Sequence, residues 1–406
     1  MSRPSLEVAD IFRSHGPAWR AANHGHVCLG QLKVMSAIER CRTAALGGHV
    51  ARCENDACGH THIAYNSCRN RHCPKCQGNA AREWMEARAA ELLPVQYFHA
   101  VFTLPSEIAD MAYQNKRVIY NLLFKTSAET MQKIAANPEY LGAKVAITSV
   151  LHTWGSAMTH HPHIHMIVPG GGLSEDGERW IACRKGFFVP VKALSKLFRG
   201  MMLGKLVAAH GEGKLNFHGR LEHLNEARAF KQALRPLYRR KWFVYAKKPF
   251  AGPKAVLAYL SRYTHRVAIS NRRLIKADAE GVTFRVKDYR RNGAARYTTM
   301  TLHPHEFIRR VLIHVLPKGL HRIRHYGLFA SGAKAQNLAR MRELLGVKEP
   351  VVDAPEDNGN EEDIPASDDV TPVVCPCCGG CMRIIEVFQA GCKPRTVAEP
   401  QGIDSS

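Results

Sequence analysis

Short runs of apolar and aromatic residues, bounded by proline or glycine, recur between residues 97 and 170. YFHAVFTLP (97–105), GAKVAITSVLHTW (142–154) and HPHIHMIVPG (161–170) are rich in β-branched and aromatic residues and predict three strands. The segment between the first two, roughly 106–135, predicts helix. A short GSAMTHH turn joins the second and third strands, so these two predict an antiparallel hairpin.

The third strand carries histidines where an exposed strand would carry ordinary polar residues. Because strand side chains alternate between faces, His163 and His165 share one face while Ile164 enters the core. His161 has the same parity but precedes Pro162, where strand pairing should fray, so it is the weaker candidate.

The hairpin brings in a third imidazole. A turn centred between Ala157 and Met158 places His152 directly opposite His163, and directly opposed residues point to the same face. Paired histidines on a strand are also found as polar surface residues. Three that converge indicate a metal site, and three nitrogen ligands with open positions are typical of a catalytic metal.

A later segment supplies candidate nucleophiles. GPKAVLAYLSRYTHRVAISNRRL (252–274) predicts a helix that begins near Pro253, on which Tyr259 and Tyr263 lie one turn apart. Aromatic packing explains such a pair equally well when it stands alone. Beside a metal that polarises a phosphate, a tyrosine that attacks the phosphorus makes a DNA strand transferase. The DNA-contact candidates here are Arg262, Arg266, Arg272 and Arg273.

The charge of the chain changes the picture of its partners. The net charge is +22, and residues 349–369 hold nine acids and no Lys or Arg. Without that stretch the chain has 57 basic and 26 acidic residues, a net charge of +31. We therefore expect a polyanionic partner, DNA, although a merely solvated basic surface is the alternative. No apolar run is long enough for a membrane span and no secretion signal is evident, so we expect a cytoplasmic, nucleoid-associated protein.

Thirteen cysteines without a secretion signal favour metal thiolates over disulfides. The spacing of two pairs predicts a structural Zn²⁺ site made of Cys53, Cys58, Cys73 and Cys76. A second zinc site is drawn from Cys41, His49, Cys68 and His72, with the alternative that the two histidines are surface residues that touch phosphate. Arg69 and Arg71 lie within the same stretch and are further DNA-contact candidates.

Composition divides the chain into four parts. We predict a zinc-binding DNA-contact domain over 1–94, a catalytic domain over 95–348, an acidic disordered linker over 349–373, and a short cysteine-rich tail over 374–406. In the tail, Cys375 and Cys378 are spaced as a zinc knuckle, and the alternatives left open are a small zinc ribbon, a truncated remnant and half of an intermolecular site. The sequence leaves a homo-oligomer open.

Three motif blocks together, HPHIHMIVPGGG, YLSRYTHRVAISN and SCRNRHCPKCQ, resemble the rolling-circle HUH transposases typified by insertion sequence ninety-one. The resemblance spans about residues 30–345. It implies an α+β fold in which an HUH-nuclease core, an antiparallel sheet with packed helices, follows a small zinc-binding domain. His163 and His165 match the HUH pair, Tyr259 and Tyr263 match the two-tyrosine motif, and in related relaxases a third histidine lies where His152 does.

What the resemblance implies about activity is cleavage and rejoining of single-stranded DNA at insertion-sequence ends through a 5′-phosphotyrosine. Family members use Mg²⁺ or Mn²⁺, and histidine ligands favour Mn²⁺. Two rival interpretations stay open: a replication initiator or relaxase with the same chemistry, and a zinc-containing DNA-binding regulator without catalysis. No phosphate-binding loop of the Walker type is present, which argues against a built-in helicase motor.

Overall fold

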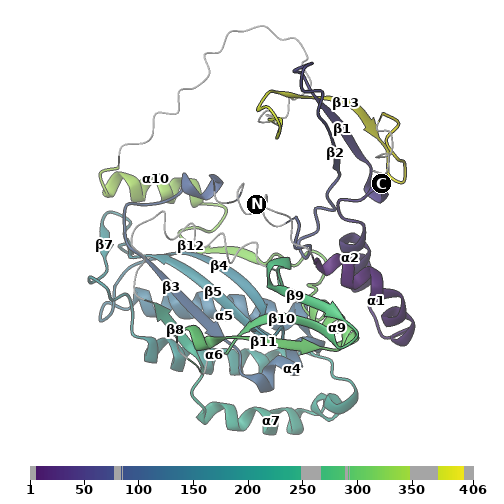
Figure 1. Cartoon of the computed structure of the whole chain (residues 1–406). Helices are drawn as coiled ribbons and strands as arrows, with labels where there is room; N and C mark the ends of the chain where they lie inside the picture. Colours follow the sequence, from purple (N-terminus) through teal and green to yellow (C-terminus); the bar gives the residue numbers. More distant parts are fainter. Residues whose placement is uncertain are drawn as a thin grey trace.

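The structure is a computed structural model that describes residues 6–76, 84, 86–247, 267–288, 291, 293–347 and 374–396. Figure 1 shows a central antiparallel sheet with helices against it and a small, separate sheet to one side. The chain is α+β, as the sequence predicts. Among the described helices, none has both the length and the apolar character that a bilayer crossing requires.

The central sheet has five strands in the order β12-β4-β5-β3-β8, and every neighbouring pair is antiparallel. The three predicted strands are confirmed in its middle. The strands are β3 (Tyr97–Thr103), β4 (Ala146–Trp154), β5 (His160–Pro169), β8 (Val244–Lys247) and β12 (Ile323–Gly327).

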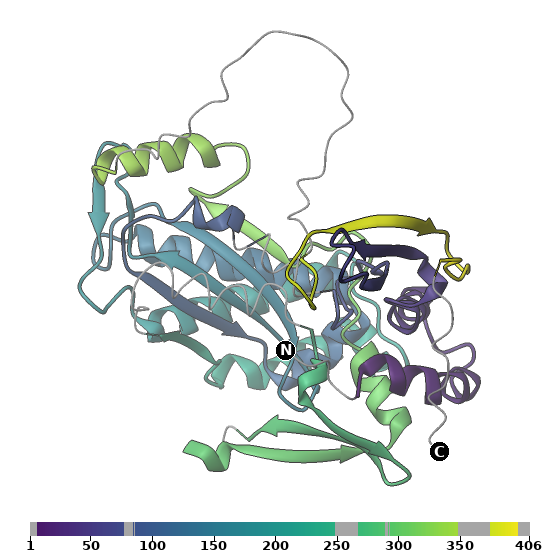
Figure 2. The same cartoon turned by 45° about the horizontal axis from the view of Figure 1, so that its top comes forward.

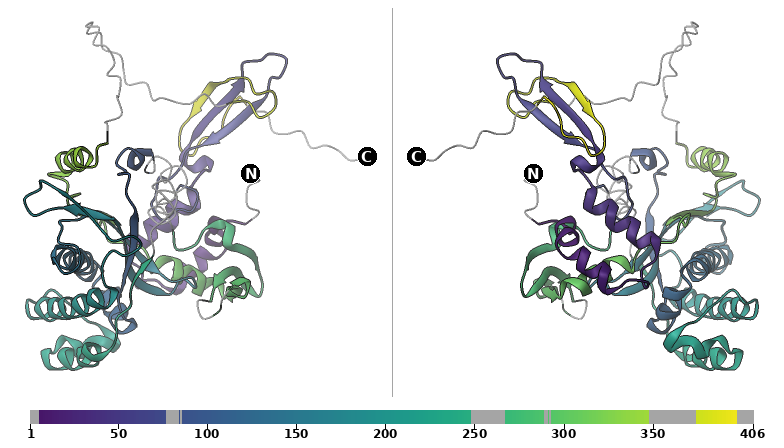
Figure 3. Two further views of the ribbon diagram at one scale, coloured as in Figure 1. Left: turned by 90° about the vertical axis from the view of Figure 1, so that its left-hand side faces the viewer. Right: turned by 90° about the vertical axis from the view of Figure 1, so that its right-hand side faces the viewer.

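Four helices cover one face of this sheet, which Figure 3 shows edge-on. They are α4 (Ser106–Gln114), α5 (Lys116–Ala136), α6 (Val191–Gly211) and α7 (Ala227–Arg239). The main core lies between them and the sheet, with Phe102, Phe198 and Trp242 fully buried. Ile164 enters this core, as the strand alternation predicts.

The helix predicted over 106–135 is divided in two at Asn115. The Asn115 side-chain amide donates to the carbonyls of Met111 and Asn216, and its backbone leaves the helical region. An asparagine that hydrogen-bonds nearby carbonyls competes with the helix ladder, so it ends α4 before α5 begins.

A second core lies on the other side of the sheet and joins residues 268–315 of the predicted catalytic domain to the N-terminal helices. It combines α1 (Val8–Ala22) and α2 (Leu29–Arg40) with α9 (Pro304–Leu312) and with a three-stranded sheet of β9 (Leu274–Asp278), β10 (Gly281–Lys287) and β11 (Tyr297–Leu302) in the order β11-β10-β9. Phe12, Met35, Phe284 and Phe307 are buried together there. Residues 6–40 therefore do not form a core of their own, and the proposed boundary at residue 94 separates segments that share apolar packing.

The remaining described strands and helices are short. They are β1 (Gly48–Cys53), β2 (Thr61–Tyr65), β6 (Gly171–Leu173), β7 (Trp180–Ala182), α10 (Lys334–Leu344), β13 (Met382–Phe388) and the 3-10 turns η1 (Ala44–Leu46), η2 (Gly219–Asn225), η3 (Asn271–Arg273) and η4 (Gly293–Arg296).

The cysteine-rich tail lies against the N-terminal part of the chain. Strand β13 pairs antiparallel with β1, which pairs with β2, so that the small sheet has the order β13-β1-β2. Figures 1 and 2 show the yellow tail lying along β1. Residues 374–396 are thus part of the N-terminal module in space, which the predicted division into a separate tail does not anticipate.

Candidate metal centres

The hairpin of β4 and β5 places three histidines on the sheet face that the four helices leave uncovered. His152 pairs directly with His163, and Val150 pairs with His165. This is the register that the turn predicts. The ligand nitrogens of His152, His163 and His165 all lie within 4.8 Å of one another, and the group does not include His161.

The spacing of the imidazoles fits a single ion. The Nε2 atoms of His163 and His165 are 3.1 Å apart. Two ligands in adjacent positions of an octahedron, each about 2.1 Å from the ion, are about 3.0 Å apart. His152 and His165 are buried while His163 is partly exposed, so the group is open on one side. The three imidazoles suit a divalent transition metal, which would keep open positions for oxygen ligands.

Contacts of the outer nitrogen atoms leave Nε2 of His163 and Nε2 of His165 facing the centre. The carbonyl of His161 accepts from Nδ1 of His163 at 2.6 Å, and Nδ1 of His165 lies 2.8 Å from Nε2 of His99. If Nδ1–H of His165 donates to His99, the Nε2 lone pair of His165 points at its neighbours, as a metal ligand requires.

His99 is a functional candidate that the sequence did not single out. It lies on β3 opposite Ile167, on the same face as His165, and is only 3% exposed. Within YFHAVFTLP it looks like one polar residue in an apolar strand. Its role depends on the β3–β5 register, which connects residues 66 positions apart.

We expect His99 to be a positioning residue. Replacing it with phenylalanine keeps the ring but removes the acceptor, which should weaken Mn²⁺ binding by about 10- to 100-fold. His99→Gln keeps an acceptor and should lose less. The measurement is the Mn²⁺ dissociation constant of the full chain, from the spin-resonance signal of free Mn²⁺. Equal affinity in His99→Phe and the unmodified protein would contradict this role.

Aromatic rings enclose the centre. Trp154 stacks on His152 with ring centroids 4.7 Å apart and planes 17° apart. Behind it, His314 is completely buried: Thr153 Oγ1 lies 3.1 Å from its Nδ1, and its Nε2 lies 3.0 Å from the Met158 carbonyl. Burial lowers the pKa of His314 to about 3. A neutral imidazole there accepts from Thr153 and donates to Met158.

This buried histidine predicts loss of stability in acid. The pKa of His314 in the folded protein lies below its value of about 6.5 in the unfolded chain. Above pH 6.5 the imidazole is neutral in both states, so the free energy of unfolding loses nothing through this residue. As the pH falls from 6.5 towards 3, the unfolded state binds a proton that the folded state does not. At pH 5 this costs about 2 kcal/mol.

The check is urea unfolding at pH 7 and pH 5, with His314→Gln as the comparison. Glutamine keeps a donor for Met158 but does not titrate, so its stability should fall less between the two pH values. Zinc release in acid affects both proteins alike. Parallel losses in the two proteins would contradict the assignment.

The two tyrosines lie outside the described residues, as do Arg262 and Arg266. The first described residues after them lie close to strand β4, which carries His152. Val267, Ala268 and Ile269 line the same cavity as Thr153 and Trp154, which neighbour His152 on β4.

The other arginine candidates differ in their surroundings. Arg69 and Arg272 are exposed. Arg273 donates to the carbonyls of Arg285, Ala268 and Ser156. Arg71 is partly buried and donates to the carbonyls of Leu320 and Pro317. The guanidinium groups of Arg71 and Arg273 thus bind backbone carbonyls within the protein.

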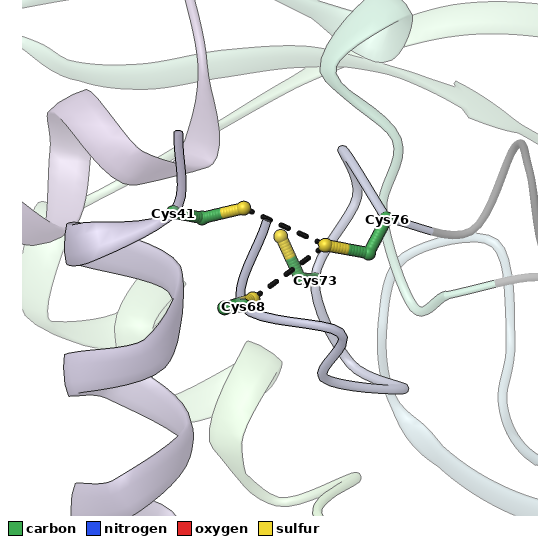
Figure 4. Close-up of side chains that lie close together, drawn as sticks. All are labelled: Cys41, Cys68, Cys73 and Cys76. Atoms are coloured by element: carbon green, nitrogen blue, oxygen red, sulfur yellow. Dashed lines mark hydrogen bonds between the residues drawn. The ribbon is translucent and has the colours of Figure 1, made fainter. Parts of the chain in front are cut away.

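Eight cysteines form two groups of four, divided differently from the predicted sites. The first group consists of Cys41, Cys68, Cys73 and Cys76, whose sulfur atoms lie within 4.8 Å of one another. Figure 4 shows the four side chains converging, with Cys76 Sγ 3.5 Å from Cys41 and 3.6 Å from Cys68. Cys73 and Cys76 are thus together as predicted, but their partners are Cys41 at the end of α2 and Cys68.

Hydrogen bonds among the thiols of this first group couple their ionisation. Side-chain hydrogen bonds from neighbouring thiols lower the pKa of Cys41 to about 2, and the bond with Cys41 raises the pKa of Cys68 to about 12. One thiolate therefore forms at the expense of the next. A Zn²⁺ ion would remove this competition, because it stabilises every thiolate that binds it.

Cys53 and Cys58 belong to the second group, with Cys375 and Cys378 from the tail. The prediction that they share a site with Cys73 and Cys76 is therefore corrected. His49 and His72 are in neither group. His49 pairs within the small sheet, and His72 lies with its Nε2 3.5 Å from the Leu316 amide, where burial lowers its pKa to about 3. Sequence spacing could not reveal this division because half of the second group lies more than 300 residues away.

Comparison with known proteins identifies two transposase families along the chain. Residues 146–337 match a family described as "Putative transposase", and residues 11–104 match a family described as "Transposase zinc-binding domain" of the insertion sequence ninety-one type. No solved structure matches the chain.

Two relatives are similar over most of their length. "Putative transposase y4qJ" of Sinorhizobium fredii (strain NBRC 101917 / NGR234) is 55% identical over 350 residues, which is 86% of this chain and 87% of the relative. "Transposase for insertion sequence element IS801" of Pseudomonas savastanoi pv. phaseolicola is 27% identical over 324 residues, 79% and 75% of the two chains.

Proposed function

The chain belongs to the transposase family typified by insertion sequence ninety-one, and from that premise we propose that it cuts and rejoins single-stranded DNA through a 5′-phosphotyrosine. A transposase binds and processes DNA, which agrees with the basic chain. The proposal goes further in three respects: the strandedness of the DNA, the tyrosine nucleophile and the catalytic metal.

The single observation that carries the proposal is the convergence of three histidines on the open face of the central sheet. Their nitrogens lie within 4.8 Å of one another, with the inner nitrogens oriented by His99 and by the His161 carbonyl. We propose His152, His163 and His165 as the ligands of Mn²⁺ or Mg²⁺. When bound, the ion would polarise a phosphate oxygen and neutralise charge that develops on it.

The proposed reaction conserves the energy of the broken bond. The phenolate oxygen of Tyr259 or Tyr263 attacks the phosphorus, a P–O bond to tyrosine forms, and the bond to the 3′ oxygen breaks. That oxygen leaves as a 3′-hydroxyl after it gains a proton from solvent. Attack by another 3′-hydroxyl on the phosphotyrosine then joins DNA and releases the tyrosine. Val267, which follows the tyrosines in the sequence, lines the same cavity as Trp154, beside His152 on strand β4. This closeness supports the choice of Tyr259 and Tyr263 as nucleophiles.

Arginines would hold the DNA backbone. The candidates are Arg262 and Arg266, together with Arg69 and Arg272, which are exposed. Arginine suits phosphate oxygens because its donors form a planar fork. The proposed setting is the cytoplasm, at nucleoid DNA. Two element ends must be processed, and the proposal therefore includes a homo-oligomer in which a second copy of the chain processes the second end.

The test is capture of the covalent intermediate. The full chain is incubated with labelled single-stranded DNA from the ends of its own element, with Mn²⁺ or with a chelator, and separated on a denaturing gel. We expect metal-dependent label on the protein, and peptide mass mapping should place the nucleotide on Tyr259 or Tyr263. Adding an oligonucleotide with a free 3′-hydroxyl should transfer the label to DNA.

The outcomes separate the rival functions. Tight binding to the element ends without an adduct would overturn the proposal in favour of a zinc-containing regulator. An adduct that rejoins only its own broken strand, with no transfer to a separate target, would favour the replication initiator or relaxase. Equal adduct formation on double-stranded DNA would contradict the single-strand preference.

A further inference from the structure

The second cysteine group brings together the two ends of the chain. Cys53 ends β1 and Cys58 lies in the turn before β2, while Cys375 and Cys378 lie in the turn that precedes β13. The Sγ atoms of Cys58 and Cys375 are 3.8 Å apart although 317 positions separate the residues in sequence. The matched zinc-binding region ends at residue 104, so half of this group lies outside it.

The distances fit four thiolates around one ion. Tetrahedral Zn²⁺ with Zn–S bonds of about 2.3 Å requires sulfur atoms about 3.8 Å apart. Cys53 and Cys378 are separated by 3.4 Å, Cys58 and Cys375 by 3.8 Å, and all four sulfurs lie within 4.8 Å. These separations exceed the S–S bond length of about 2.05 Å, so neither pair is a disulfide.

Each half of the group lies in a tight backbone turn. On the N-terminal side, the amides of Cys58 and Gly59 both donate to the carbonyl of Asn55. On the tail side, the Cys375 amide donates to the carbonyl of Gly380, and the Gly379 amide donates to the carbonyl of Cys375. Backbone turns therefore position each pair of cysteines, and the fold brings the two pairs together.

The N-terminal module is shaped to receive the tail. Strand β13 pairs with β1 from Gly48 opposite Phe388 to Cys53 opposite Met382. A side chain at Gly47 would place its β-carbon 2.6 Å from the Phe388 carbonyl, closer than real contacts allow. Phe388 is buried and packs edge-on against Tyr65 with ring centroids 5.9 Å apart. The tail therefore completes the sheet, and the cysteines lie at the end of a specific interface.

We propose that one Zn²⁺ ion joins the two ends of the chain through Cys53, Cys58, Cys375 and Cys378. The ion makes the tail an integral part of the zinc module, which binds two Zn²⁺ ions in all. This site does not depend on the tyrosine chemistry proposed above, so each can fail without the other.

The experiment counts zinc in the full-length protein. Elemental analysis after extensive gel filtration should give two Zn²⁺ per chain. Cys58→Ser and Cys375→Ser should each reduce the count to one. The double variant Cys58→Ser/Cys375→Ser should also hold one, because both cysteines serve the same ion. The Zn²⁺ ion that remains should be bound by the first cysteine group, which includes Cys73. Its presence would show that the rest of the chain is folded.

The tail contains matched controls. Cys377 and Cys381 are exposed neighbours of the proposed ligands but lie outside the group, so Cys377→Ser and Cys381→Ser should keep two Zn²⁺. A double variant without zinc would mean two separate sites and would overturn the proposal. So would one Zn²⁺ in the unmodified protein, two in Cys375→Ser, or equal zinc loss in the control variants.

A second measurement needs no substitution. In the unmodified chain, alkylation followed by peptide mass spectrometry should modify Cys377 and Cys381 quickly and spare Cys58 and Cys375. A chelator should expose Cys58 and Cys375 at the same rate. Fast modification of Cys375 before chelation, at the rate of Cys377, would contradict a metal ligand there.

Discussion

Replacing His163 with alanine is expected to abolish the metal-dependent DNA adduct, with a loss of rate of about 1000-fold or more. The variant removes an imidazole whose Nε2 lies 3.1 Å from that of His165. The remaining two histidines would bind the ion weakly and leave it poorly placed over the phosphate. Because the arginine contacts remain, binding of single-stranded DNA should change little. The measurement is single-turnover adduct formation at saturating Mn²⁺.

His161→Ala is the matched control. The residue lies two positions earlier on β5, is exposed, and stands outside the histidine group. It supports His163 only through its backbone carbonyl, which alanine keeps. We expect a nearly normal rate. If both variants lose adduct formation to the same extent, the substitutions have damaged the strand and not removed a ligand. A normal rate of adduct formation in His163→Ala would contradict the assignment of this residue as a metal ligand.

Replacing Cys73 with serine is expected to remove one Zn²⁺ and to lower the melting temperature by roughly 10–20 °C, which corresponds to about 5 kcal/mol. Cys73 is 1% exposed and belongs to the second core, so the ion lies inside packed structure. Serine is a poor zinc ligand and leaves a buried hydroxyl among thiols. Zinc content and thermal unfolding of the full chain measure the effect.

Contacts near Cys73 explain why loss of the Zn²⁺ ion should destabilise other parts of the chain. Arg71 binds the carbonyls of Pro317 and Leu320, and the Lys75 ammonium forms a buried ion pair with Glu7 at 2.5 Å. Both contacts depend on the chain path around Cys73. Cys28→Ser is the control, because Cys28 is exposed and in neither cysteine group. An unchanged melting temperature in Cys73→Ser would show that the zinc does not hold this part together.

Several features of the site were readable from local sequence. The histidine pair and its third member follow from the alternation of strand side chains and from a short turn, both of which act over a few residues. The β4–β5 hairpin has the predicted register for this reason. The α+β class was implied by the resemblance to the transposase family, and the structure confirms it. The helix predicted over 106–135 was interrupted only where the Asn115 side chain binds nearby carbonyls.

The features that could be predicted from the sequence alone are therefore local: the strands, the histidine face of the hairpin, the strongly basic character and the thiolate-rich ends of the chain. The grouping of the cysteines, the contact between His99 and His165, and the contacts of Arg71 and Lys75 within the protein came from the tertiary structure. The physical reason is that strand periodicity and turn geometry act between neighbours. The pairing of β13 with β1, and of β3 with β5, depends on packing between segments that are far apart in the sequence. Local sequence patterns do not show which of these segments will pair.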